Sequence, residues 1–129
     1  MMTPYSQKIE KPWGYELIFT PPESLVVGKI LHLKEGLRFS YQYHDQKQET
    51  LCLLSGQAKM TIDDNELEMA PLQGYFIKPM MKHRCQAITD CDILESSTKE
   101  TGNTVRLQDD YSRGTETEEM RQQPNRGWK

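Results

Sequence analysis

The sequence has no long apolar run, no strong charge of either sign and few residues that could build a disulfide framework. Among its 129 residues are three cysteines and three histidines, and the net charge is −3. No apolar stretch approaches the roughly 20 residues of a membrane-spanning helix, and the N-terminus lacks the apolar core of a signal peptide. The weak charge gives no footprint for nucleic acid. We therefore expect a cytoplasmic protein that binds neither membrane nor nucleic acid.

The cysteines are too few and too far apart to define a covalent framework. Cys52, Cys85 and Cys91 are odd in number and widely spaced, which argues against disulfides and against a zinc site made of cysteines. They fit reduced, mostly buried thiols. The length suits a single domain with one core.

Helical periodicity is also missing, and short apolar segments separated by turn signals take its place. This pattern predicts an all-β sandwich or barrel. The N-terminal residues 1–12 are expected to be an extended arm, and Trp13, Tyr15, Leu17 and Phe19 to form one aromatic face of the first strand. Residues 1–114 are expected to form the domain and residues 115–129 a polar C-terminal tail, with a short surface helix at 115–120 and a flexible end. The further expected strands lie at 25–34, 38–44, 49–55, 58–62, 67–70, 75–77, 83–88 and 92–96.

One short stretch concentrates groups that bind metals. Gln42 and His44 are two residues apart, so both side chains point to the same face of a strand. Four polar residues follow as a turn, and Glu49 then opens a Leu-rich strand. A hairpin of this kind brings an amide oxygen, an imidazole and a carboxylate together, which suits a divalent metal. The alternative is three polar residues on an exposed hairpin.

The spacing of this stretch resembles the first motif of the cupins, G-x5-H-x-H-x(3,4)-E-x6-G. Gly36, Gln42, His44, Glu49 and Gly56 fall at its positions, with Gln42 where most cupins have His. The resemblance implies a single-domain cupin, a double-stranded β-helix or jelly-roll barrel, with a bound divalent metal.

The second cupin motif, G-x5-P-x-G-x2-H-x3-N, is matched less completely. Its histidine falls on His83, whereas Lys78, Met80 and Ala87 replace the family's Pro, Gly and Asn. The resemblance thus implies a fourth metal ligand, His83. The alternative is a surface histidine beside Lys82 and Arg84.

A closer resemblance is to the type II mannose-6-phosphate isomerases, the domain that ends the bifunctional mannose-1-phosphate guanylyltransferases. It covers about residues 9–114 and is carried by EKPWGYEL, the QYH–E–SG core, IKPMMKHR and VRLQDDYSR. It implies isomerisation of mannose 6-phosphate to fructose 6-phosphate through an enediolate that the metal stabilises. It also puts forward Lys47, Arg106 and Arg113 as contacts of the sugar phosphate. The alternative is that the two arginines pair with Asp109 and Asp110, and the residues do not identify the proton-transfer base.

The chain departs from these isomerases near the expected site. Asp45 and Gln46 stand where relatives carry histidines, Lys47 stands where an Arg is usual, and Thr50-Leu51 replaces a His-Trp pair. A non-catalytic cupin that binds a sugar or another small ligand is therefore an alternative, as is a cupin dioxygenase or sugar-nucleotide epimerase. The expected metal is zinc, with manganese, iron or nickel as alternatives. Because a sheet edge is a liability that pairing covers, we expect a homodimer.

Overall fold

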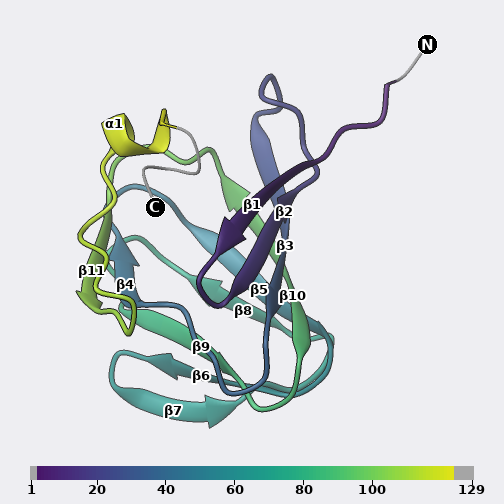
Figure 1. The fold of residues 1–129 in the computed structure, drawn as a ribbon, viewed down its shortest axis with the longest axis vertical. Helices are drawn as coiled ribbons and strands as arrows, with labels where there is room; N and C mark the ends of the chain where they lie inside the picture. The colour runs from purple at the N-terminus through teal and green to yellow at the C-terminus, as the bar shows by residue number, and fades with distance from the viewer. Residues whose placement is uncertain (1–2, 124–129) are drawn as a thin grey trace.

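The computed structural model describes residues 3–123, which fold into two antiparallel sheets that face each other (Figure 1). The six-stranded sheet has the order β1-β2-β3-β10-β5-β8, and the five-stranded sheet has the order β11-β4-β9-β6-β7. The strands of the first sheet are β1 (Gln7–Lys11), β2 (Gly14–Ile18), β3 (Val26–Leu33), β10 (Cys91–Thr98), β5 (Glu49–Ser55) and β8 (Gly74–Ile77). Those of the second are β11 (Thr104–Gln108), β4 (Tyr41–His44), β9 (His83–Ala87), β6 (Ala58–Ile62) and β7 (Asn65–Glu68).

The core lies between the two sheets because the central strands alternate between buried and half-exposed residues. In β10, Cys91, Ile93, Glu95 and Ser97 are buried, and the residues between them are not. Strand β5 alternates in the same way from Glu49. This period of two is what a strand with one face on the core requires. The buried apolar cluster comprises Trp13, Leu31, Leu33, Phe39, Leu51, Leu53, Ala58, Met60, Met69, Ile77, Cys85, Ala87, Cys91 and Ile93.

Two expectations about the N-terminal region were wrong. Residues 7–11 are not an extended arm but strand β1, which pairs with β2 and buries Ile9. The expected single aromatic face of the next strand is also split, because Trp13 is buried in the core whereas Phe19 is 42% exposed. Glu16 of this strand points to the interior. The polar sequence of β1 hides the strand, since only one of its residues reaches the core.

The C-terminal region contains a further strand that the sequence did not predict. Strand β11 pairs with β4 at a sheet edge and buries only Thr104, so it has little apolar signal. The chain then returns beside it, where Thr104 and Glu116 form an isolated bridge, and ends in helix α1 (Glu118–Arg121). Figure 1 shows α1 and β11 on the same side of the molecule. The expected flexible end, residues 124–129, lies outside the described residues.

Other expectations concern the cysteines and membrane spans. Each of the three cysteines is a free thiol, and Cys85 and Cys91 are buried, as expected. Within residues 3–123, no helix has the length and apolar character that crossing a membrane would take.

Candidate metal centre and its cavity

Three of the four expected metal ligands meet inside the sandwich. His44 ends β4, Glu49 begins β5 and His83 begins β9, and one ligand atom from each lies within 4.8 Å of the others. All three are buried, with exposed fractions of 5%, 3% and 0%. The burial of His44 and Glu49 therefore rules out the alternative that they are polar residues on an exposed hairpin. The burial of His83 likewise rules out a surface histidine.

Strand pairing explains how residues distant in the sequence reach one place. Residues 45–48 link β4 of one sheet to β5 of the other, so His44 and Glu49 approach each other across the interior. The Asp45 carboxylate fixes this link by accepting hydrogen bonds from the backbone and side-chain amides of Asn103, at 2.7 and 3.1 Å. His83 joins the pair because β9 lies beside β4, with His83 opposite Gln42.

His83 shows why this cluster suits a cation. Its Nδ1 lies 3.0 Å from the carbonyl oxygen of Met81, which can only accept, so Nδ1 carries the proton and the neutral ring has its lone pair on Nε2. That Nε2 is buried and makes no hydrogen bond, although it lies 2.9 Å from Oε1 of Glu49. Two acceptors therefore face each other, and a cation between them would satisfy both.

His44 presents a second nitrogen to the same oxygen. Its Nε2 lies 3.2 Å from Oε1 of Glu49, and its Nδ1 lies 2.9 Å from the Thr104 hydroxyl, which orients the ring. Burial, reinforced by the charge of Lys47, lowers the pKa of His44 to about 4. The imidazole is therefore neutral at physiological pH, which is the form that binds metals.

Gln42 lines the same cavity as His44 and Glu49. Its Oε1 accepts a hydrogen bond from the Ser40 hydroxyl at 2.6 Å, which holds the amide in place. An amide oxygen has two lone pairs, so this bond leaves one for a cation. The donor set would then be one amide oxygen, two imidazoles and one carboxylate, which suits a divalent transition metal.

Lys47 is close to the metal cluster but lies inside an ion-pair network. Its Nζ is 3.1 Å from Glu95, 3.4 Å from Glu100 and 3.5 Å from Glu49. Burial alone would lower the pKa of Lys47, but these carboxylates outweigh it and raise the pKa well above its ordinary value. Burial alone would raise the pKa of Glu49, but the charge of Lys47 and the hydrogen bond with His44 outweigh it and hold that pKa well below its ordinary value. Glu49 is therefore an anion at this site.

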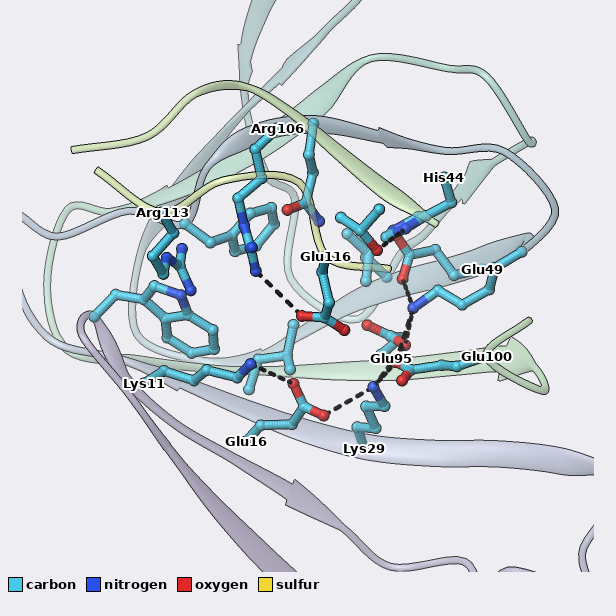
Figure 2. A pocket seen from close by; sticks show the side chains of 17 residues that line it. Lys11, Glu16, Lys29, His44, Glu49, Glu95, Glu100, Arg106, Arg113 and Glu116 are labelled. Atoms are coloured by element: carbon cyan, nitrogen blue, oxygen red, sulfur yellow. Dashed lines mark hydrogen bonds and ion pairs between the residues drawn. The ribbon is translucent and has the colours of Figure 1, made fainter. Parts of the chain in front are cut away.

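The network also includes charged residues that the motifs did not mark. Lys29 pairs with Glu16 at 2.8 Å and with Glu100, and it lies 3.9 Å from Glu95 (Figure 2). Burial, reinforced by Glu49, raises the pKa of Glu95 to about 7. A signal for these residues was present in the sequence, because Lys29 and Glu95 occupy the inward-facing positions of their strands.

The two arginines expected to contact phosphate both line the cavity, and both already have partners. The Arg113 guanidinium donates two hydrogen bonds to Asp109, at 2.9 and 3.1 Å, and the Arg113 backbone amide donates a third at 2.7 Å. This is the pairing with an aspartate that the alternative predicted. Arg106 instead donates to the carbonyl of Gly114 at 2.7 Å and to Glu116 at 3.2 Å, while its buried Nε has no hydrogen-bond partner among residues 3–123. Figure 2 shows Arg106 and Glu116 directed toward each other.

The cavity beside the cluster is small and mostly polar. Its volume is about 60 Å³, and Trp13, Leu31, Phe39 and Leu51 form its apolar wall. The remaining lining residues are Lys11, Glu16, Lys29, Gln42, His44, Lys47, Glu49, Glu95, Glu100, Thr104, Arg106, Arg113 and Glu116. The cavity thus brings the metal cluster and the arginines to one space.

Solved structures share this architecture at low sequence identity. KdgF from Halomonas sp. has a TM-score of 0.65 and 10% identity, covering 74% of this chain and 86% of that chain. The capsular polysaccharide assembling protein CapF from Staphylococcus aureus has a TM-score of 0.64 and 16% identity, and the match covers 86% of this chain and 33% of that chain. A Trp-to-Tyr variant of oxalate decarboxylase from Bacillus subtilis has a TM-score of 0.61 and 16% identity, and the match covers 72% of this chain and 27% of that chain. These likenesses concern the fold alone.

Sequence comparison is more specific about the family. No curated protein matches the chain. The family model described as mannose-6-phosphate isomerase C-terminal matches residues 2–110, which is most of the chain. The expected cupin fold is confirmed by the two facing antiparallel sheets and by the structural neighbours. The protein is therefore a cupin that belongs to the family of mannose-6-phosphate isomerase C-terminal domains.

Proposed function

We propose that this protein is a divalent-metal-dependent isomerase that interconverts mannose 6-phosphate and fructose 6-phosphate. The observation that carries the proposal is the pair of imidazoles turned toward one carboxylate oxygen, beside a cavity that two arginines also line. Family membership supports the choice of a sugar phosphate as substrate.

The metal would be held by His44, Glu49 and His83, with the amide oxygen of Gln42 beside them. A bound divalent cation would supply positive charge that polarises a sugar carbonyl and stabilises the oxygen anion that develops. Zinc is the first candidate, and manganese, iron or nickel are also compatible with this donor set.

The other residues of the cavity would bind the sugar phosphate and exclude water. Arg106 is the best-placed phosphate ligand, because its buried Nε lacks an acceptor. Arg113 lines the same cavity, although Asp109 already engages it. Trp13 and Phe39 form an apolar wall that would keep water from the reacting carbons. Lys47 would balance the carboxylates behind the metal ligands rather than reach the phosphate.

A coupled assay for fructose 6-phosphate tests this proposal, with metal-free protein and with added zinc, manganese, iron or nickel. We expect turnover only with metal, and a loss of at least a hundredfold in kcat/KM for Glu49→Gln. The control is Glu66→Gln, which makes the same change at an exposed residue that pairs with Lys59. Absence of turnover in folded, metal-loaded protein would contradict the isomerase assignment, and sugar-phosphate binding without turnover would favour the non-catalytic alternative.

A further inference from the structure

The cavity is too small for the molecule that the proposed function requires. Its volume of about 60 Å³ corresponds to about four to six water molecules, at roughly 10–15 Å³ each. Pockets that hold small molecules usually have volumes of about 300–1,000 Å³. A sugar phosphate can therefore enter only if some part of the lining moves.

The lining segment that is least integrated into the sheets is the C-terminal strap, which we define as residues 114–121. It is anchored by the bridge to β11, where Thr104 and Glu116 exchange two backbone hydrogen bonds of 2.9 Å. Its helix α1 contains no buried residue. Polar contacts rather than apolar packing thus hold the strap, so releasing it would expose little core.

The strap places one buried carboxylate into the cavity. Glu116 is 4% exposed, and its two oxygens lie 3.2 Å from the Arg106 guanidinium and 2.9 Å from Nε of Arg121. In Figure 2, Glu116 lies between Arg106 and the lysine–glutamate network. A carboxylate that accepts hydrogen bonds from Arg106 occupies a position suited to the anionic group of a ligand.

A chain of ion pairs connects the strap to the metal cluster. Arg121 contacts Glu100 at 3.4 Å as well as Glu116, and Glu100 contacts Lys47, which contacts Glu49. Charges brought into the cavity therefore act on the same network that holds the strap.

We propose that the C-terminal strap is a lid, and that the Glu116 carboxylate is an internal competitor that an incoming phosphate group must displace from Arg106. Displacement frees the guanidinium, opens the cavity beside the metal cluster and lets the ligand enter. The choice of phosphate rests on the proposed function, whereas the competition itself depends only on the contacts of Glu116.

Isothermal titration with inorganic phosphate tests the competition without any turnover. We expect Glu116→Gln to bind phosphate at least tenfold more tightly than the wild type, because the competing charge is removed while the side-chain shape is kept. The matched control is Glu119→Gln, an equal change of charge on the exposed side of the same segment, which should alter the affinity less than twofold. Circular dichroism confirms that each variant is folded.

A second variant covers the case in which Glu116→Gln does not fold. Thr117→Val removes the hydroxyl that caps helix α1 and leaves every charge around Arg106 intact, so it should loosen the strap and also strengthen phosphate binding. Unchanged or weaker phosphate affinity in the folded variants, or no phosphate binding by any of them, would overturn the lid. If Glu116→Gln gains affinity but no variant isomerises mannose 6-phosphate, the lid stands and the proposed function fails.

Discussion

Replacing Lys47 by Met probes the buried charge network that supports the metal cluster. The change keeps the aliphatic length but removes an ammonium that lies 3.1–3.5 Å from Glu95, Glu100 and Glu49. Breaking a buried ion pair by removing one partner costs about 3–5 kcal/mol. Because Lys29 still lies near Glu95 and Glu100, we expect the lower end, a loss of about 3 kcal/mol at pH 8.

The loss should depend on pH in a defined direction. The pKa of Glu95 is about 7 and rises further when Lys47 is removed, because Lys47 lowers it. A carboxyl whose folded pKa is raised stabilises the fold at low pH and loses that contribution as the pH rises. Lys47→Met should therefore be less destabilised at pH 5.5 than at pH 8.

Urea unfolding, monitored by circular dichroism, measures the loss in the free energy of unfolding at pH 5.5 and at pH 8. The control is Lys82→Met, which removes an exposed lysine 3.6 Å from Asp64 and should cost less than about 0.5 kcal/mol. A loss below about 1 kcal/mol for Lys47→Met at pH 8, or the same loss at both pH values, would refute the reasoning.

Two further predictions concern turn geometry and protonation. Gly56 has φ +78°, and a Cβ there would lie 2.1 Å from the Asp90 carbonyl oxygen, whereas Gly36 has the same φ with open space around it. Gly36→Ala should therefore lower the free energy of unfolding by about 1 kcal/mol, and Gly56→Ala by at least about 2 kcal/mol more. Equal losses for the two variants in urea unfolding would count against the clash. In metal-free protein, His44 has a pKa of about 4 against an ordinary 6.5, so the unfolded chain takes up its proton first and stability falls from about pH 6.5 to pH 4, by about 3 kcal/mol in total. Observation of the His44 ring by NMR gives this pKa directly, and a value above 6 would show that the ring is not buried as described.

The motif residues could be predicted from the sequence because their arrangement is local. Gln42, His44 and Glu49 lie within eight residues, so strand periodicity and a turn were enough to bring them together. The expected hairpin was wrong, because β4 and β5 belong to opposite sheets and the turn crosses between them. The placement of His83 needed the family resemblance, since only the pairing of β9 with β4 brings it to the others. The homodimer stays a prediction.

Strand alternation places Lys29 and Glu95 on inward faces, but their pairing and the burial of the strap could not be predicted, for a different physical reason. Glu95 and Lys29 meet because β10 pairs with β3, a register that no local pattern specifies. Glu116 lies in a polar segment, which composition alone indicates to be exposed. Its burial follows from two long-range contacts, with Thr104 and Arg106, that compensate the cost of removing a carboxylate from water.

The most direct test of the metal centre is the stoichiometry of metal binding. Elemental analysis and calorimetric titration of protein purified without chelator should find one divalent ion per chain. Glu49→Gln and His83→Ala should each weaken the affinity at least a hundredfold, and Glu66→Gln should leave it unchanged. Folded protein that binds no divalent ion, or that binds one equally well after Glu49→Gln, would contradict a metal held by His44, Glu49 and His83.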